Sequence, residues 1–166
     1  MKTTRRGLQR AGLLLIVLAA LTFPLQALAG EQVPLKGSDS GSFTLEVDAC
    51  GTGVAAVVID TVGKATHVGK YAYHANECFN LTTGAFSATF TITAANGDTI
   101  HGTYAGQVGV VVGDLAPYEQ DNVITGGTGR FAGASGGFHL SGIANLVSLE
   151  ASQRISGTVS SPGSLK

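Results

Sequence analysis

Two runs of the chain, residues 85–94 and 98–108, alternate between apolar and polar side chains almost without exception. The apolar set is Phe86, Ala88, Phe90, Ile92 and Ala94 in the first run, and Ile100, Gly102, Tyr104, Gly106 and Val108 in the second. Because successive side chains of a β-strand point to opposite faces, this alternation predicts two strands that each bury one face. No stretch after residue 30 shows a helical apolar period, so we expect an all-β fold.

The parity of the alternation also predicts how the two runs are connected. A two-residue turn at Asn96-Gly97 would place Phe90 opposite Thr103 and split the apolar face. A three-residue loop that ends on Gly97 at positive φ keeps that face whole. The pairs would then be Ile92 with Ile100, Phe90 with Gly102, Ala88 with Tyr104, Phe86 with Gly106, Thr93 with Thr99, Thr91 with His101, and Thr89 with Thr103. Aromatic rings would lie over glycines, which lets a sheet curve while its inner face stays filled.

Short connections rich in Gly, Asn and Asp divide the rest of the chain into similar segments. The eight expected strands are residues 40–48, 54–60, 66–80, 85–94, 98–112, 118–125, 136–147 and 153–159. Regularly spaced strands of this kind are typical of an up-and-down antiparallel barrel or a sandwich. The length suits one core, so we expect a single domain over 30–166, with frayed tails at 30–36 and 160–166.

The first 29 residues have the pattern of a signal peptide. Four basic residues precede an apolar stretch at 11–23, which is too short to span a membrane as a helix. Ala27-Leu28-Ala29 supplies the small residues that signal peptidase reads, so we expect a mature chain that begins at Gly30 and is exported to the periplasm or the cell exterior. An uncleaved anchor helix is the alternative, and both the general secretory and the twin-arginine routes fit the pattern.

The charge of the mature chain excludes some partners. Without residues 1–29 it has six Lys or Arg against eleven Asp or Glu, a net charge of about minus five. Such a domain has no basic cluster to neutralise phosphates, which argues against nucleic acid and anionic membrane surfaces. No second long apolar stretch is present, so no stable membrane insertion is expected.

Two cysteines, Cys50 and Cys78, are present in this chain. Thiols of exported proteins are normally oxidised, so we predict a disulfide between them. The alternative is two separate buried thiols on neighbouring strands.

A glycine-rich segment from Ile124 to Gly133 interrupts the strand pattern. We interpret it as a strand end, a tight turn and one short helical turn packed by Phe131. Together with Thr66-His67-Val68-Gly69-Lys70 and the hairpin around Asn96-Gly97, this segment resembles the secreted bacterial proteins related to the allene oxide cyclase and dirigent barrel superfamily. The resemblance covers about 37–160, and the Gly-Gly-Thr-Gly-Arg-Phe turn is its most specific part.

The resemblance implies an eight-stranded antiparallel barrel with a largely apolar lumen. The plant members are often trimeric or dimeric, which makes a homo-oligomer an open alternative for this chain. Plant allene oxide cyclase steers the closure of an unsaturated fatty-acid epoxide, and dirigent proteins steer the coupling of phenoxy radicals. No stretch here matches the residues that act in either, so no catalytic residue is assigned.

Two glycine strings match functional motifs without the structural context that those motifs require. The segment 133–137 fits a G-x-S-x-G elbow at Ser135, but no acid and then His follow it as a hydrolase needs. The segment 127–132 fits a dinucleotide fingerprint, but no βαβ unit surrounds it. Both are interpreted as turns, and no cofactor is predicted.

The histidines give no metal site. His74 and Glu77 are three residues apart on one strand, so they fall on opposite faces. His101 and His139 alternate with apolar positions and should point outward, whereas His67 either enters the lumen or caps a strand end.

The chain between 113 and 122 is expected to be an acidic loop. Asp114, Glu119 and Asp121, with Asn122, could bind calcium there, but such loops are more often only solvated. No metal is therefore predicted.

The aromatic residues leave the function open. We predict that Phe86, Phe90, Tyr104, Phe138, Tyr71 and Tyr73 line the lumen. They either fill it or border a cavity, with room left by Gly102 and Gly106. Three functions follow, of which the first is favoured: a barrel that binds a small apolar molecule, a non-catalytic envelope or interaction module, and an isomerase or cyclase. A buried Glu, Asp or His projecting into a cavity would favour the enzyme.

Overall fold

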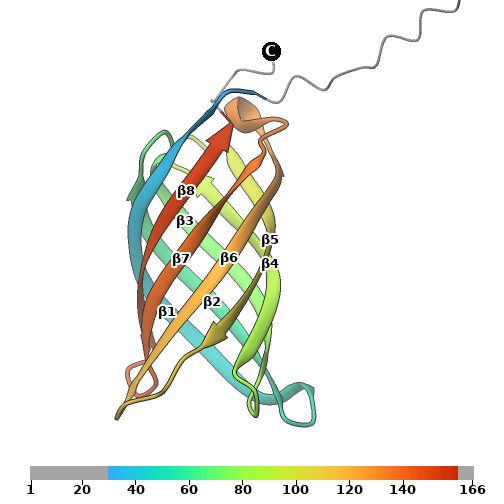
Figure 1. Cartoon of the computed structure of the whole chain (residues 1–166), viewed down its shortest axis with the longest axis vertical. Helices are drawn as coiled ribbons and strands as arrows, with labels where there is room; N and C mark the ends of the chain where they lie inside the picture. The colour runs from blue at the N-terminus through green and yellow to red at the C-terminus, as the bar shows by residue number, and fades with distance from the viewer. Residues whose placement is uncertain (1–29, 161–166) are drawn as a thin grey trace, which may run out of the picture.

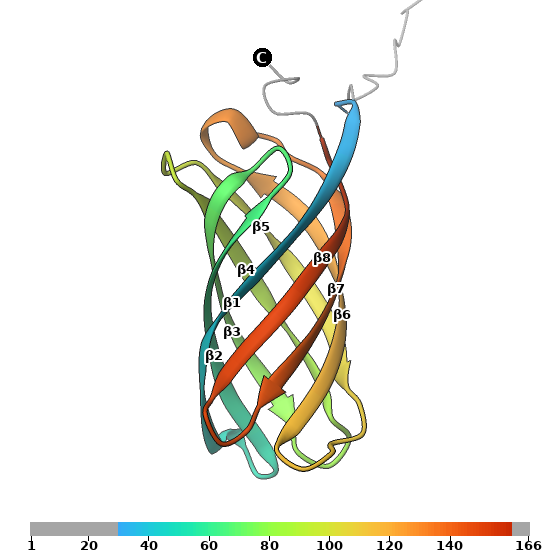
Figure 2. The same ribbon diagram turned by 90° about the vertical axis from the view of Figure 1, so that its left-hand side faces the viewer.

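The computed structural model describes residues 30–160 as one closed antiparallel barrel (Figure 1). Each strand pairs with the next in the sequence, and the first pairs with the last (Figure 2). The strands are β1 (Gln32–Gly51), β2 (Val54–Ala65), β3 (Gly69–Asn80), β4 (Ala85–Ala94), β5 (Thr99–Val108), β6 (Leu115–Gly127), β7 (Gly136–Asn145) and β8 (Glu150–Ser160). The predicted all-β class and eight strands are confirmed. The predicted signal peptide and residues 161–166 lie outside the described residues.

The β4–β5 hairpin has the predicted register. Phe90 pairs with Gly102, Phe86 pairs with Gly106, and Thr91 pairs with His101. Gly97 has a φ of 87°, as the three-residue loop requires. The alternation of apolar and polar residues predicted this register correctly, because a shift by one residue would turn the apolar side chains away from the buried face.

The N-terminal segment differs from the prediction. Residues 30–36 were expected to be a frayed tail, but β1 begins at Gln32 and runs along β8, with Gln32 opposite Ser160 and Leu35 opposite Gly157. The side chain of Leu35 is completely buried. A barrel must pair its first strand with its last, so this closure orders a segment that looks irregular in sequence.

The expected acidic loop at 113–122 is also wrong in its extent. β6 begins at Leu115, so only the start of that segment is a loop. Glu119 and Asp121 are exposed on the outer face of β6, whereas Asn122 is buried inside the barrel.

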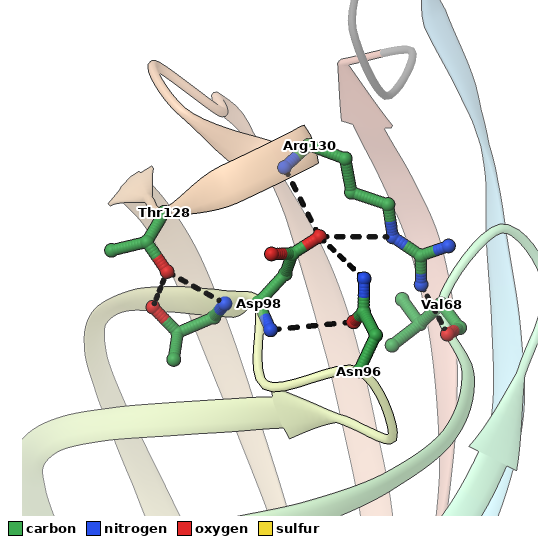
Figure 3. Close-up of polar contacts among 6 residues, drawn as sticks. Val68, Asn96, Asp98, Thr128 and Arg130 are labelled. Carbon is green, nitrogen blue, oxygen red and sulfur yellow. Dashed lines mark hydrogen bonds and ion pairs between the residues drawn. The ribbon is translucent and has the colours of Figure 1, made fainter.

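A 3-10 turn, η1 (Gly129–Phe131), covers the end of the barrel at which β6 leads to β7. Phe131, Val68 and Ala134 are buried there as part of the main core. Asp98 Oδ2 accepts hydrogen bonds from the backbone N of Arg130 and from Asn96 Nδ2, at 3.1 and 2.7 Å (Figure 3). Arg130 Nη2 in turn donates to the Val68 carbonyl at 2.7 Å. The predicted helical turn is confirmed, and it closes this end.

A disulfide joins Cys50 of β1 to Cys78 of β3, as predicted. β2 lies between these two strands, and the β1–β2 register is irregular between Glu46 and Gly51. The bond therefore ties the end of the β1–β2 hairpin to the next strand of the barrel.

No helix within residues 30–160 is long and apolar enough to cross a membrane.

Candidate functional site

A cavity of about 310 Å³ lies at the end of the barrel opposite η1. The β1–β2, β3–β4, β5–β6 and β7–β8 connections surround this end, which is at the bottom of Figure 1. The wall is mostly apolar and includes Phe43, Ile59, Phe79, Phe86, Ala116 and Ala144. Three polar side chains also line it: Glu77, Tyr118 and Gln120. Pockets for small ligands have this size and this combination of an apolar wall with a few polar groups.

Glu77 is the acidic residue of the cavity. It stands on the inner face of β3, its side chain is only 8% exposed, and its Oε2 accepts a hydrogen bond from the Tyr104 hydroxyl at 2.7 Å. Burial raises the pKa of Glu77 to about 7, although the bond from Tyr104 acts in the opposite direction. The carboxyl can therefore exchange a proton near neutral pH.

A chain of amides and hydroxyls lies beside Glu77. Gln120 Nε2 donates to the Tyr73 hydroxyl at 3.4 Å and to Asn122 Oδ1 at 2.9 Å. Asn122 Nδ2 donates to the Phe138 carbonyl at 3.2 Å. Burial raises the pKa values of Tyr73 and Tyr104, so both phenols stay protonated.

A second carboxyl, Asp39 of β1, lies within the barrel and is not among the residues that line the cavity. The Tyr71 hydroxyl donates a short hydrogen bond to Asp39 Oδ2, while Asp39 Oδ1 is buried without a partner. Burial raises the pKa of Asp39, and the side chains of Thr61, Tyr71 and Gln153 oppose that rise. Gln153 Oε1 also accepts a hydrogen bond from Tyr118 at 2.7 Å.

The two interior carboxyls have no cationic side chain beside them within residues 30–160. Lys36, Lys64, Lys70 and Arg154 are exposed on the outer surface. Arg130 is engaged with Asp98 and the Val68 carbonyl at the closed end. The interior is thus acidic or neutral, depending on the protonation of Glu77 and Asp39.

The predicted lumen residues divide into two groups. Phe86 lines the cavity. The other five, Phe90, Tyr104, Phe138, Tyr71 and Tyr73, are buried in the packed core. Ring centroids are 5.4 Å apart for Phe90 and Phe138 and 5.9 Å apart for Tyr73 and Phe90. This aromatic cluster fills the interior between the cavity and the closed end.

The space that was expected next to Gly102 and Gly106 is occupied by other side chains. A Cβ at Gly102 would lie 2.8 Å from Phe90 Cε1, and one at Gly106 would collide with the Phe86 ring. The aromatic rings of β4 occupy the space that the glycines of β5 leave. The open volume lies instead nearer the mouth, where small residues such as Ala116, Ala144 and Ala151 line the wall.

The sequence predicted that Glu77 and His74 lie on opposite faces of one strand, but Glu77 was not predicted as a site residue. The structure confirms the opposite faces, since His74 is exposed and its Nδ1 lies 2.7 Å from Asp60 Oδ1. The alternation along the strand could have identified Glu77, because this residue shares a face with Tyr71 and Tyr73, which were predicted to line the lumen. Gln120 is buried on β6, within the strand expected at 118–125, but the same residues were also interpreted as part of an acidic loop, and its inward direction was not predicted.

The other histidines and acids lie apart from the cavity. His101 and His139 are exposed, as predicted, and His139 Nδ1 lies 2.9 Å from Asp121 Oδ1. His67 occupies the β2–β3 turn with a φ of 62° and is exposed. In the part of the chain that the structure describes, no group of three or more His, Cys, Asp or Glu side chains could hold a metal ion.

Comparison with known proteins identifies the fold. No family profile matches the sequence, and no curated protein matches it. The pterocarpan synthase dirigent protein PsPTS1 is similar in structure, with a TM-score of 0.55 at 12% identity over 79% of this chain and 96% of that one. For GePTS1, another pterocarpan synthase dirigent protein, the values are 0.57 at 13% identity over 83% of this chain and 92% of that one. The chain folds as a dirigent-like eight-stranded β-barrel.

Proposed function

We propose that this protein is an exported barrel that binds a small apolar molecule in the cavity at its open end. One observation carries the proposal: a cavity of about 310 Å³, walled mainly by aliphatic and aromatic side chains, at one end of an otherwise packed barrel. A barrel of eight strands has an interior just wide enough for side chains or for one small ligand. Here the side chains fill one part and leave the other open.

The mouth of the cavity supports the entry of an apolar molecule. Leu45, Leu81, Val111 and Leu146 line the cavity and are between 37% and 46% exposed. Val110, Val112 and Val147 are more exposed still and stand in the same group of loops. Exposed apolar residues gathered at one site commonly mark a place of binding.

The exported location is supported by the disulfide between Cys50 and Cys78. Disulfides persist in oxidising compartments and are rare in the cytosol of mesophiles.

Binding can be tested with the mature protein and phenylbutanol, a neutral apolar probe. Titration calorimetry should give saturable binding with a negative heat-capacity change, because apolar surface leaves water. Ala144→Leu, which fills the cavity, should weaken binding, whereas the outward-facing Thr91→Leu should not. Native mass spectrometry of the protein as isolated, with thermal-shift screens of fatty acids, terpenoids and phenolics, then narrows the natural ligand. If none of these molecules binds, the interaction-module function becomes the better explanation.

A second candidate, an isomerase or cyclase, is favoured by Glu77 alone. A carboxyl with a pKa of about 7 that borders an apolar cavity can take and return a proton at neutral pH. The test is deuterium exchange next to the carbonyl of phenylbutanone in D2O. Exchange that is faster with the wild-type protein than with Glu77→Gln would support proton transfer, and equal rates would reject it.

A further inference from the structure

The charges around the open end are all of one sign. The segments that form this end, 43–57, 77–88, 105–118 and 142–152, contain no Lys, Arg or His. They carry Glu46, Asp48, Asp114 and Glu150, in addition to Glu77 inside the cavity. Of the five Lys and Arg residues within 30–160, Lys36, Lys64, Lys70 and Arg130 belong to the opposite, closed end, and Arg154 is exposed on the outer face of β8. An approaching cation is therefore attracted to the mouth, and an anion is repelled.

Inside the cavity, Glu77 has an acceptor to spare. Its Oε2 is bonded to Tyr104, but no group within residues 30–160 donates a hydrogen bond to its Oε1. Ionised carboxylates are rarely buried without a positive partner. A cation that enters the cavity would supply a partner for this carboxylate.

The groups that face Glu77 supply no positive charge. The titratable ones are the phenols of Tyr73 on β3, Tyr104 on β5 and Tyr118 on β6. Gln120 of β6 is a neutral neighbour at the cavity wall. Asp39 of β1 is the other interior carboxyl, and its charge would add to the negative potential.

We propose that the cavity selects small apolar molecules that carry a protonated amine, with the ammonium group paired to Glu77 and the apolar part against the aliphatic and aromatic wall. This inference rests on the proposed binding function and specifies its ligand class. The rings of Phe79 and Phe86 in the same wall also favour a cation over an anion. Fatty acids and other carboxylates are disfavoured, because they would bring a second negative charge beside Glu77.

Pairing with an ammonium group requires ionised Glu77, so binding depends on pH. Burial raises the pKa of Glu77 to about 7, and a bound cation would lower it again. An amine should therefore bind more tightly as pH rises from about 5.5 to about 8, and it should release a proton on binding in the lower part of that range.

The experiment compares phenylbutylamine, phenylbutanol and phenylbutyrate, which share one apolar skeleton and differ in the charge of the end group. At about pH 8 we expect the amine to bind at least about tenfold more tightly than the alcohol, and the carboxylate to bind most weakly. Calorimetry in two buffers of different ionisation enthalpy should detect proton release with the amine and none with the alcohol.

Two variants test whether Glu77 causes the expected preference for the amine. Glu77→Gln should bind the amine and the alcohol with similar affinity and should release no proton. Glu119→Gln removes a carboxylate from the outer face of β6 and should leave the preference intact. Equal affinities of the wild-type protein for all three probes, or a preference for the carboxylate, would overturn the ligand class but leave the binding function standing. Failure of all three probes to bind would reject the binding function itself.

Discussion

Glu77 is the buried carboxyl that borders the cavity of the barrel. Its neighbours in sequence, Asn76 and Cys78, point to the outer face of β3, while its own carboxyl is buried beside the Tyr104 hydroxyl. Two carboxyls inside the barrel, Glu77 and Asp39, have raised pKa values, chiefly because burial disfavours their charged forms. The stability of the folded protein therefore depends on the protonation of these two groups.

The folded protein should become less stable as pH rises through the range in which Glu77 ionises. Its pKa is raised from the ordinary 4.5 to about 7, so between these values the folded state holds a proton that the unfolded state has lost. The free energy of unfolding should fall with rising pH across this window, by up to about 3 kcal/mol. Urea unfolding at a series of pH values measures the slope. Glu77→Gln should make the slope shallower, with the contribution of Asp39 remaining, and should stabilise the protein above neutral pH, whereas Glu119→Gln should leave the slope as in the wild-type protein.

Gly97 tests the β4–β5 loop. It has a φ of 87° with no atom near the position of a Cβ, so Gly97→Ala would suffer backbone strain without a steric clash. We expect a loss of about 1 kcal/mol in unfolding free energy. Gly109 is the matched control, because its φ is not in the left-handed region and a Cβ there would make ordinary contacts with Pro117. A neutral Gly97→Ala would mean that the loop has another conformation.

At the scale of elements, the ends of the strands carry the features that shape the barrel. The first residues of β1 close it against β8, and the last part of β1 is tied to β3 by the disulfide. β3 also carries Glu77 and Phe79, so the covalent bond lies next to two residues that line the cavity. The disulfide therefore restrains β3 next to the opening of the cavity.

Removal of the disulfide should cost stability. The two cysteines are 28 residues apart, and opening a loop of that size costs about 3 kcal/mol on the chain-entropy account. The double variant Cys50→Ala/Cys78→Ala should therefore unfold at lower urea concentration than the oxidised protein. Under reducing conditions the wild-type protein should match the variant. Equal midpoints for the oxidised protein and the variant would contradict this expectation.

At the scale of the whole molecule, the two ends of the barrel differ. Phe131 of η1 and Val68 fill one end, where hydrogen bonds of Asp98 and Arg130 join the segments that cover it (Figure 3). The other end is open, apolar and surrounded by acidic residues. The two ends of the described barrel therefore present different surfaces to an approaching molecule.

The exported form should begin at Gly30. The basic n-region, the short apolar stretch and Ala27-Leu28-Ala29 motivate this expectation. Intact-mass measurement of protein recovered from outside the cytoplasm checks it. A mass that still contained residues 1–29 would show that the segment remains as an anchor.

The sequence by itself determined what depends on neighbours along the chain. Parity decided the β4–β5 register, the opposite faces of His74 and Glu77, and the outward direction of His139, because side chains alternate along any strand. The tertiary structure alone decided which part of the barrel interior is filled by side chains and which part is left as a cavity. Closure of the barrel paired residues 32–37 with β8, and the aromatic rings of β4 covered the glycines of β5 and moved the open space toward the mouth. Glu77 meets Tyr104 only because β4 lies between β3 and β5 in a curved sheet, a relation that no local pattern contains.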